Sequence, residues 1–246
     1  MDKKYKLLED ETIKFEGRTL YRIQALKDFG SVEKDQKGGY IQSEYNLSHE
    51  GNCWIHDNAV AMDRSRVLDD ATMFDNASMH DSASMYDSTE MHNHTSMHDF
   101  TEMHDNTLMY NYASMHDFTE MHDNTLMYNY ASMYDNASIH DCSRMYDHSR
   151  MYDDSEMTGE SIIKNDVCLS ANIQSTILES NNDFIEFDSI GEFRRTIIYL
   201  KKEKLINVNN CFVGNVDELE EKVLRKYKHK KTNYKDVIRM VRALEQ

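Results

Sequence analysis

A six-residue pattern runs through residues 55–174 and limits the fold of this chain more than any other feature of its sequence. In each unit, as from Met73 to Ser78, the first residue is apolar, the third is usually Asp or Asn, and the fifth is small. The residues from Met97 to Ser114 recur unchanged in the eighteen residues that follow. Three units therefore make one larger repeat, and the segment holds twenty units.

Strand alternation predicts how each unit is oriented. The first and fifth residues should point inward and their neighbours outward. The third and fourth residues should form a corner, where Asp and Asn favour turns. The chain has no proline, so none removes a hydrogen bond from a ladder of strands. The pattern therefore predicts a rod of stacked three-sided coils.

This pattern resembles the hexapeptide-repeat family of left-handed parallel β-helix proteins, whose unit has an aliphatic residue followed four places later by a small one. In this chain Met fills fourteen of the first positions between Met73 and Met157, and Ile139 is the one exception. Met is more flexible than the usual branched residues. The resemblance implies an all-β fold, a left-handed parallel β-helix over 55–174 with three hexapeptides per coil.

Residues 1–54 are predicted to form a β cap that leads into the first coils, because an open final coil would leave a free sheet edge. Alternation over residues 5–36 predicts a few short strands, and Gly38-Gly39 predicts a turn. The hexapeptide phase is traced back from Ala59 through Cys53, Leu47 and Ile41.

The stretch from Tyr21 to Trp54 is similar to the opening part of hexapeptide proteins found in bacteria and phages, some of which carry a transferase label. The similar parts include Gly38-Gly-Tyr-Ile-Gln-Ser and Gly51-Asn-Cys-Trp. This resemblance implies the architecture and a phage or mobile-element origin, but no reaction.

Residues 175–246 are predicted to form a small α+β domain. Around Cys211-Phe-Val-Gly and Glu221-Lys-Val it resembles a domain that follows phage hexapeptide repeats. Its strands are predicted at 184–187, 196–200 and 205–208. Asn215 is predicted to cap one helix, and a second helix is predicted over about 233–244.

Charge is concentrated in the repeats. Residues 55–174 contain 22 acidic and 5 basic residues, a net charge of −17, and no Lys or Arg lies between Arg66 and Arg144. Such a surface repels nucleic acid, so we expect no direct nucleic-acid partner. A basic groove on a host protein is the partner that this charge favours.

The eighteen-residue period stacks the acidic residues into columns at two corners. The predicted partner-binding residues are Asp81, Asp87, Asp99, Glu102, Asp105, Asp117, Glu120, Asp123, Asp135 and Asp141. The alternative is that Asp only suits the corner backbone and keeps the rod soluble. Two facts oppose that alternative: stacked like charges cost energy, and the third corner uses Asn93, Asn111 and Asn129 instead.

Another face is apolar. Its predicted residues are Leu108, Tyr110, Tyr112, Leu126, Tyr128 and Tyr130. A stripe of this kind predicts a covering partner or a second copy of the chain, as a homotrimer or homodimer. The alternative is that tyrosines simply favour strand positions.

The histidines also form columns, namely His80, His98 and His116, and His104, His122 and His140. Imidazoles beside carboxylates are zinc or copper ligands in other proteins. A regular repeat produces such columns without any metal, so neither a metal nor another cofactor is predicted. Acyltransferases built on this coil resemble one another in having loops that cover the substrates; these repeats contain no insertion, so no catalytic residue is predicted.

Four cysteines without CxxC spacing indicate a reducing compartment. The chain has no membrane-length apolar run and begins with polar residues, so we expect a cytoplasmic protein without a membrane partner. The sequence predicts a non-catalytic acidic binding protein that inhibits a host nucleic-acid-binding protein, such as a defence nuclease, by mimicking nucleic acid. The alternatives are a hexapeptide-class acyl or sugar transferase and a structural or assembly module.

Overall fold

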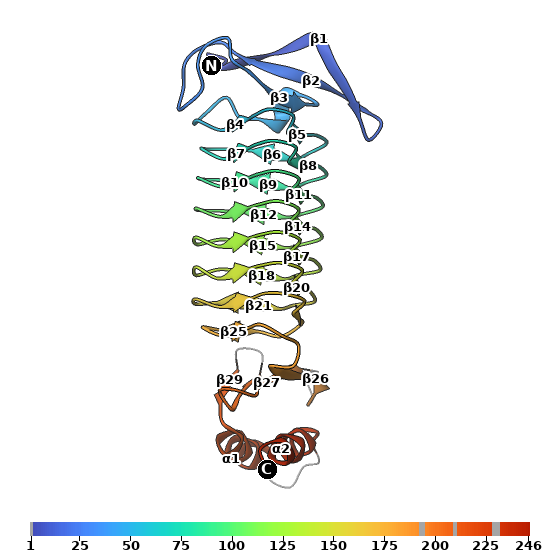
Figure 1. Ribbon diagram of the computed structural model, residues 1–246, viewed down its shortest axis with the longest axis vertical. Helices are drawn as coiled ribbons and strands as arrows, with labels where there is room; N and C mark the ends of the chain where they lie inside the picture. The colour runs from blue at the N-terminus through green and yellow to red at the C-terminus, as the bar shows by residue number, and fades with distance from the viewer. Residues whose placement is uncertain (1, 192–194, 209–210, 228–231) are drawn as a thin grey trace.

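Each hexapeptide forms one short strand and one corner, and the corners turn the chain through three sheets (Figure 1). The computed structural model describes residues 2–191, 195–208, 211–227 and 232–246. Strand partners within the rod lie eighteen residues apart, as for Met97 with Met115. This register confirms the three-unit coil of a left-handed parallel β-helix.

The first sheet has ten strands: β1 (Tyr5–Phe15), β2 (Arg18–Ala25), β3 (Lys37–Ile41), β5 (Val60–Ala61), β8 (Ser78–Met79), β11 (Ser96–Met97), β14 (Ser114–Met115), β17 (Ser132–Met133), β20 (Arg150–Met151) and β23 (Cys168–Leu169). The second sheet has eight: β4 (Trp54–Ile55), β7 (Thr72–Met73), β10 (Glu90–Met91), β13 (Leu108–Met109), β16 (Leu126–Met127), β19 (Arg144–Met145), β22 (Ile162–Ile163) and β25 (Ile177–Leu178). The third has seven: β6 (Arg66–Val67), β9 (Ser84–Met85), β12 (Glu102–Met103), β15 (Glu120–Met121), β18 (Ser138–Ile139), β21 (Glu156–Thr158) and β24 (Ile173–Gln174).

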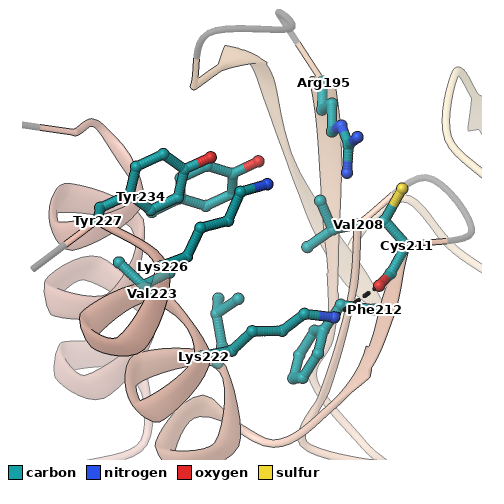
Figure 2. Close-up of a pocket in the computed structure, with 10 residues that line it drawn as sticks. Arg195, Val208, Cys211, Phe212, Lys222, Val223, Lys226, Tyr227 and Tyr234 are labelled. Atoms are coloured by element: carbon teal, nitrogen blue, oxygen red, sulfur yellow. Dashed lines mark hydrogen bonds between the residues drawn. The ribbon is translucent and has the colours of Figure 1, made fainter.

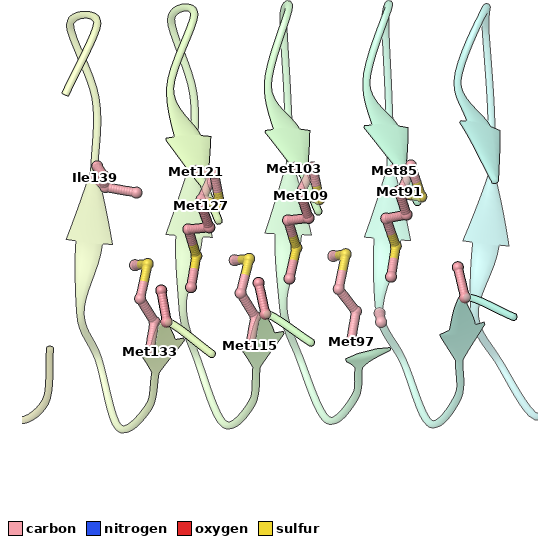
Figure 3. Close-up of a cluster of buried hydrophobic side chains, with 14 of the residues drawn as sticks. Met85, Met91, Met97, Met103, Met109, Met115, Met121, Met127, Met133 and Ile139 are labelled. Atoms are coloured by element: carbon pink, nitrogen blue, oxygen red, sulfur yellow. The ribbon is translucent and has the colours of Figure 1, made fainter. Parts of the chain in front are cut away.

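The methionines of the first positions fill the interior of the rod. Every one from Met73 to Met157 has no exposed surface, and the fifth-position residues such as Ala113 and Thr119 are equally buried. Figure 3 shows these side chains stacked in rows inside the coils. Burying one such side chain contributes about 1.5–3 kcal/mol relative to leaving it exposed. The predicted inward positions are confirmed.

The corners explain the Asp and Asn of the third positions. From Asp57 to Asp153 every third-position residue has φ between +51° and +65°. Among residues with a side chain, Asp and Asn adopt this left-handed region most readily. The predicted corner at the third and fourth positions is confirmed.

The phase predicted through Cys53, Leu47 and Ile41 is wrong. Ile41 pairs with Ala61 twenty residues later, whereas Ile55 pairs with Met73 after eighteen. Two extra residues therefore lie between Leu47 and Ile55. They are accommodated by a bend at Gly51, which has φ of +63° and where a Cβ would lie 2.0 Å from a backbone oxygen.

Gly38 and Gly39 do not form a turn but lie inside β3. Added Cβ atoms would stand 2.5 Å and 2.4 Å from the carbonyl oxygens of Ile55 and Ala59, so glycine permits close packing of backbones. The few short strands predicted before them are two long strands, β1 and β2, which form an antiparallel hairpin at the end of the rod (Figure 1). Because β1 has a bulge between Leu8 and Thr12, the alternation of apolar and polar residues is interrupted there, and the sequence does not show the full length of the strand.

The last coil is shorter than the others. Met157 pairs with Ile173, sixteen residues later, so the hexapeptide phase loses two residues after Leu169. Ile163 then pairs with Leu178, fifteen residues later, so a third residue is lost before β25.

The C-terminal segment forms an antiparallel sheet of β26 (Phe184–Ile190), β27 (Arg195–Leu200), β28 (Leu205–Val208) and β29 (Phe212–Gly214), with α1 (Val216–Tyr227) and α2 (Tyr234–Leu244). The three strands and two helices are confirmed; the fourth strand was not predicted. Asn215 caps α1, since its Oδ1 accepts from the backbone N–H groups of Asp217 and Glu218 at 3.0 Å. Neither described helix has the length and apolar character needed to span a bilayer.

Candidate functional site

The predicted acidic residues lie together on one side of the rod. Asp81, Asp99, Asp117 and Asp135 are at the corner between the first and third sheets, and Asp87, Asp105, Asp123 and Asp141 are at the corner between the third and second sheets. Between these two Asp corners, Glu102 and Glu120 project from paired strands of the third sheet. We call the third sheet with its two Asp corners the acidic face.

The aspartates also have a structural role. Asp117 Oδ2 accepts a hydrogen bond from the backbone N–H of Asp135 at 3.3 Å, and Asp99 accepts likewise from Asp117. Similar bonds link Asp87 to Asp105 and Asp141 to Gly159. The carboxylates thus connect each coil to the next, which supports part of the turn-forming alternative.

The corner between the second and first sheets is here called the Asn corner. Its ladder is neutral over three successive coils, at Asn93, Asn111 and Asn129, with Asp75 before them and Asp147 after them. Asn93 Nδ2 donates to Asn111 Oδ1 at 3.1 Å, and Asn111 Nδ2 donates to Asn129 Oδ1 at 2.9 Å. Their φ angles match those of the aspartates, from +60° to +65°. The same corner can therefore be built and linked with neutral side chains.

Three histidine side chains contact the carboxylates of the aspartates that follow them in sequence. The Nδ1 atoms of His80, His98 and His116 lie 2.7 Å from the carboxylates of Asp81, Asp99 and Asp117. The three imidazoles stack with centroids 4.9 Å and 5.2 Å apart. Burial raises the pKa of Asp99, but hydrogen bonds from His98 and from the Asp117 N–H outweigh it, and the net effect lowers that pKa.

The second histidine column lies on the acidic face itself. His104 Nε2 is 3.1 Å from Glu102, and His140 Nε2 is 3.0 Å from Glu156. These contacts place an imidazole directly beside each of the two glutamates.

Two groups of side chains come close to a metal-binding arrangement. They are His80, Asp81 and His98, and Asp99, His116 and Asp117, with ligand atoms within 4.8 Å of one another. Two ligands on opposite sides of one Zn²⁺ are at most about 4.2 Å apart, given bonds of about 2.1 Å. In each group one histidine nitrogen and one carboxylate oxygen are 2.7 Å apart, which is within this limit, as for His80 with Asp81 and His116 with Asp117.

The predicted apolar face is divided in two. Leu108, Tyr110 and Leu126 are half-buried on the second sheet, and Tyr128 beside them is 39% exposed. Tyr112 and Tyr130 lie instead at the Asn corner, about half exposed, with stacked rings 4.9 Å apart. The two most exposed tyrosines of this predicted face therefore form a ridge beside the stripe.

Sequence reasoning missed a second aromatic ridge. Phe100 and Phe118 are 56% and 58% exposed, and their rings stack 5.0 Å apart. Each directly follows Asp99 or Asp117, so the ridge borders the acidic face. The sequence could have shown this ridge, because both phenylalanines hold the fourth, corner position of their units and are eighteen residues apart.

The comparisons with known proteins agree with this architecture. No family model matches the chain. A segment of 44 residues is 48% identical to the uncharacterized acetyltransferase YdcK of Escherichia coli (strain K12), and the match covers 18% of this chain and 14% of that protein. The hexapeptide period, the three-sided coil and this short match fit the hexapeptide-repeat left-handed β-helix family.

Proposed function

We propose that this chain is a non-catalytic binding protein whose acidic face occupies the basic, nucleic-acid-binding groove of a partner protein. One observation carries the proposal: Asn93, Asn111 and Asn129 of the Asn corner form the same turn and link their coils without charge. The charge of the two Asp corners is therefore not needed for the turn itself.

The distribution of charge supports a role in binding. Like charges on neighbouring strands destabilise a sheet, so a repeat selected only for stability gains from Asn at every corner. Here Asp occupies both corners that border the third sheet, with Glu102 and Glu120 between them. Clustered charge of one sign steers a partner of opposite sign and speeds association.

The geometry resembles a nucleic-acid backbone only approximately. Neighbouring coils are about 4.8 Å apart, whereas phosphates follow at about 3.4 Å along the axis of one DNA strand. A groove that binds through charge rather than through bases tolerates this difference. The partner that fits is a host protein that binds nucleic acid with little sequence preference, such as a defence nuclease, and a phage or mobile-element origin is part of the same proposal.

Affinity capture from the native host followed by salt and competition series tests the proposal. We expect a captured basic protein whose binding weakens steeply with salt and is displaced by double-stranded DNA or RNA. A captured partner that binds equally in low and high salt, and that nucleic acid does not displace, would contradict the proposal.

A second candidate function is transfer of an acyl group, which the short match to a protein named as an acetyltransferase favours. Between β4 and β23 the coils follow one another without an inserted loop to enclose a donor and an acceptor. Incubation with acetyl-coenzyme A and a panel of amine and hydroxyl acceptors separates the candidates. Catalytic release of free coenzyme A would support the transferase and oppose the binding protein.

A further inference from the structure

The two histidine columns have the same spacing in the sequence but different geometry in the structure. In the column of His80, His98 and His116 the imidazoles stack at interplanar angles of 3° and 5°, with centroids 4.9 Å and 5.2 Å apart. In the other column the rings of His104 and His122 meet at 67°, with centroids 6.2 Å apart. The eighteen-residue repeat alone therefore does not produce the first arrangement.

The aspartates distinguish the two columns further. In the first column His80 Nδ1 lies 2.7 Å from Asp81, and His98 Nδ1 lies equally close to the next residue. In the second column His122 Nδ1 lies 3.8 Å from Asp123, which is beyond hydrogen-bonding distance. Where the structure is described, only the first column forms groups of three side chains that could hold a metal ion.

Of the two groups, that of His80, Asp81 and His98 has the better ligands for a transition-metal ion. It offers two imidazoles and one carboxylate, whereas the group in the next coil offers one imidazole and two carboxylates. Imidazole favours Zn²⁺ and Cu²⁺, and oxygen ligands favour Mg²⁺ and Ca²⁺. Both carboxylates of the next group also accept a backbone N–H, as Asp117 does from Asp135, while no described backbone N–H donates to the Asp81 carboxylate.

The ligand atoms of this group need only a small adjustment to share one ion. All of them lie within 4.8 Å of one another. Because ligands on opposite sides of one Zn²⁺ are at most about 4.2 Å apart, the widest separation has to close by about 0.6 Å or less. His80, Asp81 and His98 are at least partly exposed, so rotations of their side chains can supply this movement. A neutral imidazole can carry its proton on Nε2, which leaves the Nδ1 of His80 to bind the ion.

An ion can reach this group from solvent. Asp81 and Asp99 line an open depression on the surface of the rod, which Arg18 and Arg64 also border. The Arg18 guanidinium is paired, since its Nε donates to Asp63 Oδ1 at 3.0 Å, and Arg64 is exposed. Residues 55–174 carry 22 acidic and 5 basic residues, so the surroundings attract a cation.

We propose that His80, Asp81 and His98 bind one divalent transition-metal ion that takes imidazole ligands, with Zn²⁺ as its representative. Three protein ligands and one water molecule form a common tetrahedral Zn²⁺ site. The Asp99 carboxylate, 2.7 Å from His98 Nδ1, is a second source of the fourth ligand. This site goes beyond the proposed function, because it requires no partner protein.

The exposed thiols, Cys142 and Cys211, are the other groups to which Zn²⁺ could bind. Cys211 lies in the C-terminal domain beside a cation, since Lys222 Nζ donates to its carbonyl oxygen at 2.7 Å (Figure 2). The variant Cys142→Ser with Cys211→Ser should therefore keep the affinity of the parent for Zn²⁺. Zn²⁺ is a better probe than Cu²⁺, because Cu²⁺ would oxidise these thiols.

Titration of the full chain with Zn²⁺ and, separately, with Mg²⁺ tests the site by calorimetry and by the chemical shifts of the imidazoles. We expect saturable binding of one Zn²⁺ per chain, with the largest shifts at His80 and His98. Mg²⁺ at the same concentration should not displace it, because Mg²⁺ prefers oxygen ligands. Displacement by an equal concentration of Mg²⁺, or shifts of equal size in both histidine columns, would overturn the proposal.

Substitution of single histidines provides the matched comparison. His80→Asn and His98→Asn should each weaken Zn²⁺ binding at least about tenfold, since even the residues behind a metal ligand contribute this much. The control, His104→Asn with His122→Asn, should leave the affinity unchanged, and circular dichroism checks that every variant folds. An equal loss in both columns would contradict a specific site. A loss with His116→Asn but not with His80→Asn would show that the assignment to this group is wrong.

Discussion

The two Asp corners and the Asn corner of this rod solve the same structural problem with different chemistry. All three hold their third-position residues at φ near +60°. The Asp corners link coils through carboxylates that accept backbone N–H groups, whereas the three asparagines in the middle of the Asn corner link them through side-chain amides. The fold therefore needs the left-handed turn and a hydrogen bond between coils, and the negative charge is an additional property of two corners.

Deletions that shift one corner onto another should have the largest effect on the stability of the rod. Removal of Met115 to Ser132 takes out one whole coil, so every column keeps its chemistry and the rod should fold about 4.8 Å shorter. Removal of Met115 to Glu120 keeps the inward positions but moves Asn129 beneath Asp105. We expect the six-residue deletion to unfold at a markedly lower temperature, as measured by circular dichroism. If the eighteen-residue deletion unfolds the protein and the shorter one does not, the three-unit coil is wrong.

The second prediction concerns the apolar face, which adjoins the Asn corner. If two or three chains associate through it, Leu108→Lys with Leu126→Lys should give monomers, because the new charges would be buried at the contact. Light scattering measures the change, and Ser78→Lys with Ser96→Lys on the first sheet is the control. A parent chain that is monomeric at high concentration would contradict this prediction.

Substitutions at Asp117 separate the contribution of the left-handed turn to stability from the contribution of the negative charge. Asp117→Val places a β-branched residue at φ of +65° and removes the bonds from His116 and from the Asp135 N–H. It should lower the free energy of unfolding by about 2 kcal/mol. Asp117→Asn should change it by less than about 0.5 kcal/mol, because Asn retains an acceptor and tolerates the angle. Equal losses in chemical denaturation would show that the corner itself requires the charge.

The smallest effect on stability is expected from a substitution of Glu186, where the rod meets the C-terminal domain. Glu186 accepts from the N–H and hydroxyl of Ser170 at 3.0 Å and 2.9 Å, and burial raises its pKa. Because the folded-state pKa is raised, the stability that Glu186 contributes is greatest below its unfolded-state pKa and falls as the pH rises through the folded-state value. Glu186→Gln should therefore be more stable relative to the parent at pH 7 than at pH 4. Thermal unfolding at both values measures this difference, and the opposite sign would contradict it.

The fold of the rod was predictable because three independent signals coincide at each unit: the apolar first residue, the small fifth residue and the turn-forming third residue. The ends were less predictable, since each breaks the period: two residues are added near Gly51, and two and then three are lost after Leu169. Gly38 and Gly39 indicated a turn from local preference, but the approach of Ile55 and Ala59 is a contact between distant segments that sequence does not show.

The candidate site was predictable as columns but not as contacts. The eighteen-residue period placed Asp99 above Asp117 correctly, yet it did not show that each carboxylate accepts a backbone N–H from the next coil. It also left out Phe100 and Phe118, whose exposure follows from the corner geometry rather than from their residue type.

Neutralisation of the acidic face tests the central claim most directly. The variant replaces four aspartates by asparagine at Asp99, Asp105, Asp117 and Asp123. The control variant carries Asp75→Asn and Asp147→Asn, which lie at the two ends of the Asn corner and off the acidic face.

Both variants should keep the circular dichroism spectrum and unfolding temperature of the parent, because Asn forms the same corner. The affinity of the captured partner, measured in low salt and along a salt series, is the decisive value. We predict that the fourfold variant binds at least about tenfold more weakly, with a shallower dependence on salt, while the control binds like the parent. A fourfold variant that folds normally and binds as tightly as the parent in low salt would contradict the account, and the Leu108 and Tyr128 face would become the surface to examine.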